Sequence, residues 1–550
     1  MRTTPLRPLD SDVRHPAEGR AGDTGSVRRT RARLRLLARR ACLTTMVVIG
    51  GAALAACEDD VVYQDRPPYN PPPAGAGSFL GYYDVTTSKT TCGNCHADFQ
   101  GSWSATKHAG AYNTLNSNSG KQDSCFGCHT VNGRGNAAVG TNVGWDGVKD
   151  AVYHDVQCES CHGAGQQHVD GIGQGNLVRP LAAIGLSTKG NCGDCHTGTH
   201  HPFVEEWKQS RHANLDPGRA SNPSCTGCHE ARGALAKWGV DANYVEKANA
   251  TNYQPPATCA TCHDPHGSGN PSQLRFPVTT TEPEQNLCVK CHLRYGQPQP
   301  PSTIKPHAPQ GAVLFGFAGW RPPNFAYDTS LVYGSHATTK NPKLCAGCHV
   351  VAFPVTDPAS GNFTFQATGH LFRPIPCLDA TGKPTADKTC AYTTAARSWK
   401  SCTASGCHAD ANVAATVFTN VRNRMALETG QLWADLNKNG NIDAAPTDGG
   451  LLATLKQQKP GEWNTSDITP AEGAEFNARL CGEYGSGNSD NSKGVHNPFL
   501  CDALLTSTYT YLKQVYGLAD VAGAARASTE SLMGGVLAHV KRVAQTGPAR

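Results

Sequence analysis

The strongest constraint on this chain is the spacing of its cysteines. Eighteen of its 24 cysteines fall in nine copies of one pattern, in which two cysteines are followed at once by a histidine. Eight copies read Cys-x-x-Cys-His, and the ninth has four residues between its cysteines. The fold must therefore place nine similar sites along one chain. In order, the motifs are Cys92/Cys95/His96, Cys125/Cys128/His129, Cys158/Cys161/His162, Cys192/Cys195/His196, Cys225/Cys228/His229, Cys259/Cys262/His263, Cys288/Cys291/His292, Cys345/Cys348/His349 and Cys402/Cys407/His408.

Cys-x-x-Cys-His is the attachment signature of c-type haem. The two thiols add across the vinyl groups of a porphyrin, and the histidine becomes an axial ligand of the iron. Zinc sites and thioredoxin-like pairs also use Cys-x-x-Cys, but zinc would take the pairs two at a time and needs no histidine after each. Histidine makes up only 22 of the 550 residues, so nine trailing histidines do not arise by chance. The pattern predicts nine covalently bound haems and, from them, electron transfer.

The first 56 residues are typical of an export signal that is removed from the mature protein. Eleven arginines precede an apolar run over residues 43–56, which is short for a membrane span. The run ends in Leu54-Ala-Ala-Cys57, which resembles a bacterial lipobox and implies cleavage before Cys57 and lipid attachment to its thiol. The alternative is an ordinary signal peptide with an incidental cysteine. We expect an exported lipoprotein, anchored at the periplasmic face of a membrane or at the cell surface.

The formal charge of +5 changes sign when this segment is removed. The segment holds 11 of the 49 basic and 4 of the 44 acidic residues, which leaves 38 basic against 40 acidic. This balance gives no support for a nucleic-acid partner. The expected partners are redox proteins or periplasmic and extracellular electron acceptors, with the membrane contacted through the lipid. Residues 57–78 are proline-rich and are expected to form an extended spacer.

The motif spacing indicates an internal duplication. The first cysteines of the first six motifs recur every 33 or 34 residues, so that positions 92/125/158 are repeated as 192/225/259. The segment from Trp103 to His108 also matches the segment from Trp207 to His212. These two similarities predict a three-haem unit that occurs twice.

We predict a mostly irregular and α-helical fold for the mature chain. Region 79–409 is rich in glycine, asparagine and threonine and has few periodic stretches, so short helices and loops should wrap around a haem array. Residues 410–550 lack haem motifs and should form a helical region packed on the haem region. The helices expected there are Ala411–Trp433, Ala471–Leu480, Asn497–Tyr516 and Ala527–Val543.

The supply of histidines limits how the second axial position of each iron is filled. Without the nine motif histidines and His15 of the signal segment, twelve remain, whereas the mature chain keeps only Met425 and Met533. Two histidines at every iron are therefore attainable. Five histidines stand in contexts that resemble distal-ligand segments of the multihaem c-type cytochromes of bacteria that respire metals, nitrogen or sulfur compounds. They are His108, His168, His212, His266 and His336.

This resemblance covers residues 80–410 and implies haems with two histidine ligands and low potentials. Ammonia-forming nitrite reductases of the same family carry Cys-x-x-Cys-Lys, which does not occur in this sequence, so electron transfer is favoured over catalysis. The alternatives are an oxidoreductase with one open haem, acting on a small nitrogen or sulfur compound, and a subunit of a homo-oligomer, haem filament or respiratory complex. The resemblance also implies distal positions for His307, His370 and His496, and for the ninth we choose His201 over His200, His154 and His539.

A second metal pattern begins at Asp435 and resembles the start of an EF-hand or dockerin calcium loop. Oxygen-bearing side chains stand at loop positions 1, 3, 5 and 9, with Gly440 at position 6. Position 12 is Pro446 instead of a carboxylate, and Asp448 is a substitute for it. The alternative is an asparagine- and glycine-rich turn between helices. The candidate calcium ligands are Asp435, Asn437, Asn439, Asn441 and Asp443.

Four cysteines remain outside the motifs, the signal segment and the lipid site. In an oxidising compartment they are expected to form local disulfides. The expected pairs are Cys377–Cys390 and Cys481–Cys501.

Overall fold

The described part of the chain belongs to one compact unit, residues 70–550. The computed structural model describes residues 71–137, 140–182, 191–240, 254–299, 305–323, 325, 336–337, 340–404, 408–482, 484 and 489–521. The predicted signal segment, Cys57, most of the spacer and the helix expected at 527–543 lie outside these residues.

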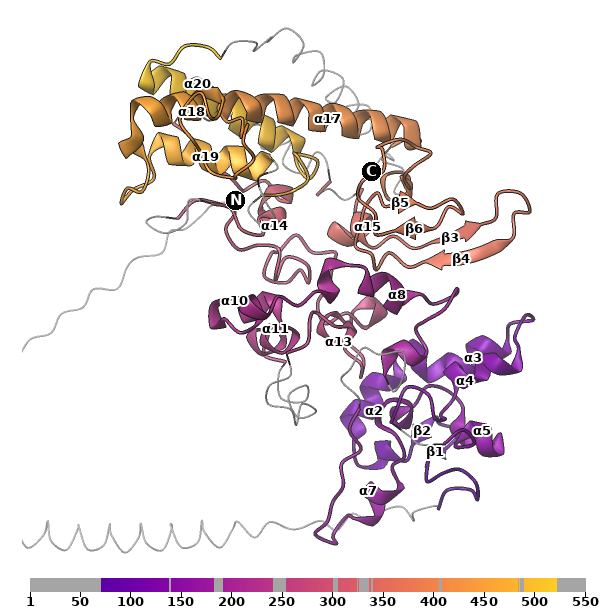
Figure 1. Cartoon of the computed structure of the whole chain (residues 1–550). Coiled ribbons are helices and arrows are strands. Elements are labelled where there is room, and N and C mark those ends of the chain that lie inside the picture. The colour runs from indigo at the N-terminus through magenta and orange to yellow at the C-terminus, as the bar shows by residue number, and fades with distance from the viewer. Residues whose placement is uncertain are drawn as a thin grey trace, which may run out of the picture. The chain divides into compact units, whose positions relative to one another are not determined.

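Short helices joined by loops make up the region of the haem motifs, which confirms the predicted fold class (Figure 1). The α-helices are α2 (Ala97–Ser104), α3 (Ala111–Asn116), α4 (Phe126–His129), α5 (Trp145–Val148), α6 (Cys158–His162), α7 (Gln166–Asp170), α8 (Phe203–Lys208), α9 (Pro217–Ala220), α10 (Pro223–His229), α11 (Ala231–Lys237), α13 (Cys259–Cys262), α14 (Gln310–Leu314), α15 (Cys345–His349) and α16 (Lys400–Thr403). The 3-10 helices are η1 (Cys92–Asn94), η2 (Lys107–Gly110), η3 (Asp123–Cys125), η4 (Ala151–Tyr153), η5 (Cys192–Asp194), η6 (Arg211–Ala213) and η7 (Pro271–Gln273).

The strands of the described residues form three separate antiparallel pairs. They are β1 (Tyr82–Asp84) with β2 (Lys89–Thr90), β3 (Phe353–Thr356) with β4 (Phe363–Ala367), and β5 (Cys377–Leu378) with β6 (Pro384–Thr385). The β3–β4 hairpin was not expected from the sequence. Its turn is fixed by Asp357, whose Oδ1 accepts hydrogen bonds from the backbone N–H groups of Ala359 and Ser360. An aspartate that caps its own turn is a recognisable turn signal.

Four longer helices form the C-terminal region (Figure 1). Three confirm the predicted helices to within one residue at either end, whereas the shorter α18 was missed. The helix starts carry ordinary capping chemistry: Asp410 caps α17, and Thr469 forms a capping box with Glu472 at the start of α19. The elements are α17 (Ala411–Leu432), α18 (Gly450–Gln458), η9 (Pro460–Glu462), α19 (Pro470–Cys481) and α20 (Pro498–Tyr516).

The largest hydrophobic core of the described residues lies among these four helices. Trp433, Phe476 and Leu504 are among its buried members. The core also includes Ala312 and Ala318, which belong to α14 and the loop after it. The C-terminal helices therefore share a core with the segment that follows the seventh motif.

Asn477 of α19 joins these two parts of the chain through hydrogen bonds. Its Oδ1 accepts from the backbone N–H of Trp320 at 2.8 Å, and its Nδ2 donates to the carbonyl of Trp320 at 2.7 Å and to Thr508 Oγ1 at 2.9 Å. The Asn477 side chain is fully buried. Gly473, one turn earlier, lies against the Trp320 ring, where any larger side chain would overlap with it.

Among the helices of the described residues, none combines the length and the apolar character needed to cross a membrane.

Replacing Asn477 by leucine tests this junction. We expect Asn477→Leu to lower the free energy of unfolding by roughly 2–4 kcal/mol, because buried polar groups of Trp320 and Thr508 lose their partners. Urea unfolding followed by circular dichroism measures the change. Gln457→Ala, an exposed position on α18, is the control and should leave the stability within about 0.5 kcal/mol of the wild type. Equal stability of both variants would contradict the role given to Asn477.

Candidate functional site

Each of the eight short motifs folds into one helical turn. In the first motif, the backbone N–H of His96 donates to the carbonyl of Cys92 at 2.9 Å, and the same bond joins His196 to Cys192. An i to i−4 hydrogen bond places residues i, i+3 and i+4 on one face of a helix. The two sulfurs and the imidazole therefore project to the same side, as attachment of one flat group requires.

The motif cysteines differ in exposure. Cys95, Cys161 and Cys192 are exposed, whereas the other described motif cysteines are half-buried. Cys95 directly follows the 3-10 turn η1. A thioether bond needs a sulfur within reach of the porphyrin edge and does not need burial, so the predicted attachment at Cys95 stands as a prediction.

The ninth motif departs from the geometry of the others. Helix α16 ends at Thr403, directly after Cys402. Because four residues separate the two cysteines, His408 follows the end of this helix instead of lying in the same turn as Cys402. The Nδ1 atom of His408 is buried, whereas Cys407 lies outside the described residues. The one-turn arrangement is thus not found at His408, and haem attachment at this motif stays a prediction.

Seven motif histidines each face a second histidine. The centres of the two imidazole rings are 6.1–6.4 Å apart in all seven pairs, although the angle between the ring planes varies from 12° to 81°. The pairs are His96–His168, His196–His108, His162–His266, His292–His212, His229–His307, His263–His370 and His349–His496.

This separation fits one metal ion between two imidazoles. Bonds from imidazole nitrogen to a metal are about 2.0–2.1 Å long and the ring centre lies about 1 Å further on, so two opposed ligands have ring centres roughly 6 Å apart. Rotation about the metal–nitrogen bond leaves this distance unchanged, which accounts for the variable plane angles. The donor set of two thiols and two imidazoles fits a c-type haem.

Hydrogen bonds at Nδ1 fix the tautomer of many of these rings. The Nδ1 atoms of His129, His162 and His263 lie 2.7–2.8 Å from the backbone carbonyls of Ala111, Pro180 and Ser272. A carbonyl can only accept, so Nδ1 must carry the proton and Nε2 is left with the lone pair that a metal needs. His168, His336 and His349 make the same kind of contact with the carbonyls of Val178, Val495 and Phe372.

Burial keeps four of the paired rings neutral. It is the main cause that lowers the pKa of His196, His212, His349 and His370 to about 4, and neighbouring histidines lower it further. A histidine with a pKa near 4 is uncharged at neutral pH. Neutral imidazole is the form that binds metals.

A buried carboxylate positions His370. Glu206 of α8 accepts hydrogen bonds from the backbone N–H of His370 at 2.7 Å and from the N–H and hydroxyl of Thr368 at 2.9 and 2.6 Å. Glu206 is 3% exposed. The loop that carries His370 is thereby held to α8, more than 160 residues earlier in the chain.

Cysteines of different motifs lie side by side. A hydrogen bond from Cys195 lowers the pKa of Cys128 to about 6, and one from Cys291 does the same to Cys228. Once a haem is attached, each cysteine is a thioether without a thiol proton, so these contacts indicate only that the sulfurs lie close together. With the motifs numbered 1–9 along the chain, the neighbouring pairs are 1 and 3 (Cys92, Cys158), 2 and 4 (Cys128, Cys195), 4 and 6 (Cys192, Cys259), 5 and 7 (Cys228, Cys291), and 7 and 8 (Cys288, Cys345).

Phenylalanine rings lie between successive histidine pairs. The Phe203 ring is 5.4 Å from His196 and 4.9 Å from His370, which places it between motifs 4 and 6. Phe372 is 5.6 Å from His370 and 4.3 Å from His212, between motifs 6 and 7. Sequence analysis missed both residues, because nothing in their local sequence marks them.

The duplicated unit recurs in three dimensions. The indole N–H of Trp103 donates to the carbonyl of Val156 at 2.9 Å, and that of Trp207 donates to the carbonyl of Ala257 at 2.9 Å. Each acceptor stands two residues before the third motif of its unit. His108 and His212, five residues after the two tryptophans, face motifs 4 and 7 respectively.

The other described histidines outside the motifs have varied surroundings. The His201 ring lies 6.4 Å from His196, a separation also found among the seven pairs, so both His108 and His201 lie at this distance from His196. Burial and the nearby His129 lower the pKa of His201. His154 stacks on Tyr112 at 3.4 Å and His200 on Phe363 at 4.8 Å. His539, which the sequence analysis passed over, lies outside the described residues.

Two motif histidines, His129 and His408, do not belong to the seven pairs. His201 and His336 are the distal candidates that remain for them. The second ligands expected at these two motifs therefore stay predictions.

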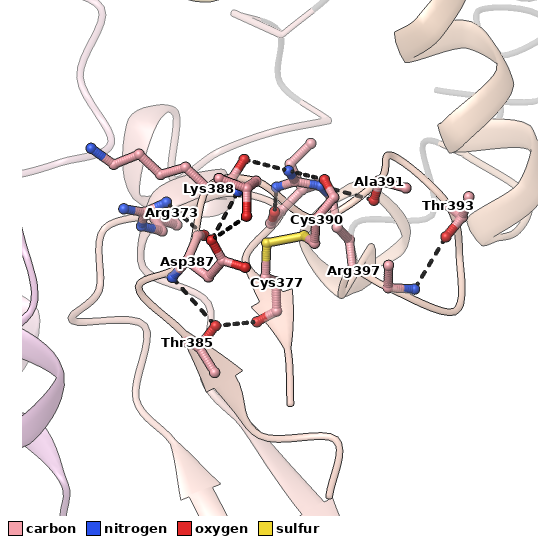
Figure 2. Close-up of a disulfide and its surroundings, with 12 residues drawn as sticks. Arg373, Cys377, Thr385, Asp387, Lys388, Cys390, Ala391, Thr393 and Arg397 are labelled. Atoms are coloured by element: carbon pink, nitrogen blue, oxygen red, sulfur yellow. Dashed lines mark hydrogen bonds between the residues drawn. A yellow bond between two sulfur atoms is a disulfide. The ribbon is translucent and has the colours of Figure 1, made fainter. Parts of the chain in front are cut away.

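The predicted disulfide Cys377–Cys390 is present (Figure 2). Figure 2 shows the Arg397 guanidinium beside it, where Nη2 donates to the carbonyls of Cys390 at 2.8 Å and Lys388 at 3.2 Å. This loop leads into α16 and the ninth motif. The sulfurs of the second predicted pair, Cys481 and Cys501, lie 2.6 Å apart in the core of the C-terminal helices.

The predicted calcium loop is organised by its own hydrogen bonds. The amides of Asn437 and Asn439 both donate to Asp443 Oδ2, at 2.8 and 2.6 Å. Asp448 accepts from the Trp433 indole at 2.8 Å and from the backbone of Leu436 and Asp443, so its carboxylate is engaged in the fold. In the described residues no group of three or more histidine, cysteine, aspartate or glutamate side chains forms a metal cluster.

These sites define a protein that holds several c-type haems along one chain. Two family descriptions agree: "Cytochrome c554 and c-prime" matches residues 91–163, and "Doubled CXXCH motif" matches residues 255–296. The chain is thus similar to multihaem c-type cytochromes over these residues.

Named relatives support this assignment. The chain is 32% identical over 163 residues to the C-type polyheme cytochrome OmcB of Geobacter sulfurreducens. The aligned region covers 25% of this chain and 20% of OmcB. It is 30% identical over 172 residues to OmcC of the same organism, covering 25% and 22%. It is 27% identical over 257 residues to the multiheme cytochrome MtrA of Shewanella baltica, covering 44% and 69%.

The chain thus spans about a fifth of the length of OmcB and OmcC. No solved structure matches it.

Proposed function

We propose that this protein relays electrons through nine c-type haems in periplasmic or cell-surface respiration. The observation that carries the proposal is the connected series of paired histidines, each beside a cysteine motif. When bound, each haem supplies an iron that accepts and releases one electron. An array of such groups conducts over a distance that a single group cannot span.

The chain's own residues hold, orient and tune the haems. The eighteen motif cysteines attach them, and the nine motif histidines are the proximal ligands. The distal ligands are His108, His168, His201, His212, His266, His307, His336, His370 and His496. Two histidines close both faces of an iron, and this favours electron transfer over substrate binding. Where a carbonyl accepts from Nδ1, as at His162, His263 and His349, it fixes the ring orientation and raises the donor strength of that imidazole.

Contacts between neighbouring sites support a route with two branches. Sites 1 and 3 adjoin through Cys92 and Cys158, and Phe99 of site 1 is 4.7 Å from His266 of site 3. Cys161 of site 3 lies close enough to Cys195 of site 4 to raise the pKa of its thiol, which indicates that the two sites adjoin. The series continues through sites 6, 7 and 8, while site 2 adjoins site 4 and site 5 adjoins site 7. The sites would connect in the order 1–3–4–6–7–8, with sites 2 and 5 as side branches.

The location follows from the N-terminal segment. We infer that Cys57 carries lipid and that residues 57–78 hold the haem region away from the membrane surface. The partners would be redox proteins or terminal electron acceptors that reach the haem edges.

Mass spectrometry of the mature protein tests the haem number and the anchor. We expect the mass of the polypeptide beginning at Cys57 plus nine haems and the acyl groups on Cys57. Replacing Cys402 and Cys407 by serine should remove one haem from the total and leave eight. A native protein with fewer than nine haems, or a colourless one from a host competent in haem attachment, would contradict the proposal.

Removing one distal histidine tests the ligand assignment. His370→Ala should convert one haem from low-spin to high-spin, because the iron above His263 loses its second ligand. Electron paramagnetic resonance and carbon monoxide binding report the change. His200→Ala is the matched control, since His200 stacks on Phe363 instead of facing a motif histidine. If His370→Ala stays fully low-spin, the pairing of His263 with His370 is wrong.

We propose, as a separate point, that residues 435–443 bind calcium. Asn437, Asn439 and Asp443 already converge, and turning the two amides over would direct their oxygens to a cation beside the carboxylate. Calcium at 100 times its dissociation constant should stabilise the protein by about 2.7 kcal/mol. Thermal unfolding with and without a chelator measures this.

Asn439→Ala should abolish the calcium effect, whereas Asn412→Ala, on the exposed side of α17, should retain it. If calcium does not change the unfolding temperature of the wild type, residues 435–443 form an asparagine- and glycine-rich turn without a bound cation.

A further inference from the structure

His496 is distinguished by the partner of its Nδ1 atom. That atom lies 2.6 Å from Oδ1 of Asp490, whose side chain is fully buried. The other Nδ1 contacts described above end on neutral oxygens of carbonyls, and His292 contacts the amide oxygen of Gln310 at 3.3 Å. His266 is 3.9 Å from Asp264, too far for a hydrogen bond, and Asp264 is paired with Arg275 at 2.9 Å.

The surroundings hold Asp490 in place. Its backbone N–H donates to the carbonyl of Leu480, at the end of α19, at 3.1 Å. Ser492 donates its hydroxyl to the second carboxylate oxygen and accepts the backbone N–H of His496 at 3.2 Å. The carboxylate is thereby aimed at the imidazole, which in turn faces His349 across 6.1 Å.

We propose that Asp490 is a positioning residue that lowers the reduction potential of the haem held by Cys345, Cys348, His349 and His496. This inference rests on the proposed function, because it assumes that His349 and His496 ligate one iron. A carboxylate that accepts the Nδ1 proton increases the electron density on the ligating nitrogen. The denser ligand and the buried negative charge both stabilise the ferric over the ferrous state, and low dielectric strengthens the effect.

The neighbouring site provides an internal comparison. Gln310 occupies at His292 the place that Asp490 occupies at His496, but it carries no charge. The two acceptors lie close together, since Gln310 Nε2 is 3.4 Å from the carbonyl of Ser489. Site 8 is therefore expected to have a lower potential than site 7. An electron then passes favourably from the site 8 iron, which is oxidised, to the site 7 iron, which is reduced.

Exchange of the two acceptors tests the proposal in both directions. In the full mature protein, Asp490→Asn should raise one low-potential component of an optical redox titration and shift one low-spin resonance signal. Gln310→Glu should lower the potential of a different component. Glu472→Gln is the matched control: it removes a buried carboxylate of the same helical region that accepts from the backbone of Asn464 and Thr469 instead of from a histidine, and it should leave the titration unchanged.

The outcomes separate the inference from the proposed function. A low-spin protein with its full haem content and unshifted titrations in both Asp490→Asn and Gln310→Glu would overturn the role of Asp490 and leave the relay intact. A high-spin iron at site 8 of the wild type would remove the ligation on which the inference rests and overturn both. If Asp490→Asn loses a haem, Gln310→Glu decides: a lowered component supports the tuning by charge, and an unchanged one overturns it.

Discussion

Opposed imidazoles, with their ring centres about 6 Å apart, join parts of this chain that the sequence keeps distant. His96 and His168 are 72 residues apart, and His349 and His496 are 147 residues apart. The described haem region has few apolar contacts to hold such segments together: its separate hydrophobic clusters contain only three to five buried residues each, and links such as that from Glu206 to His370 are hydrogen bonds. A metal group bonded to both rings, as proposed above, would supply further links, so cofactor binding and folding would be one process in this region.

The C-terminal helices share a hydrophobic core with the haem-motif region. They bring 26 buried apolar residues together in one cluster, which includes Ala312 and Ala318 from the haem-motif region. From this rigid base the chain presents His496 and Asp490 to the eighth motif. The proposed ligand and its charged partner are thus held by conventional packing.

The sequence predicted much of the fold and of the candidate site. The fold class, three C-terminal helices and the Cys377–Cys390 disulfide are confirmed, because caps, helical periodicity and local cysteine spacing are short-range signals. Helix α18 and the β3–β4 hairpin were missed, since both are short: α18 follows a glycine-rich turn, and a polar turn that resembles a loop joins β3 to β4. The assignment of nine distal histidines stays a proposal. Seven of the nine lie opposite motif histidines, and they were chosen from the sequence because of the residues that surround them. Phe203, Phe372 and Asp490 had no such context, because their importance comes from what folds against them.

The sequence by itself determined the local chemistry. It shows where thiols and imidazoles are close enough along the backbone to bind one porphyrin, and where helices begin and end. Only the tertiary structure decided which residues lie opposite each other. His108 faces the fourth motif, His212 faces the seventh and His496 faces the eighth. The structure also decided the order in which neighbouring sites adjoin. The physical reason is range. Attachment at the short motifs needs residues within one helical turn, whereas a second ligand and a neighbouring site need only proximity in space, which many loops of different length could provide.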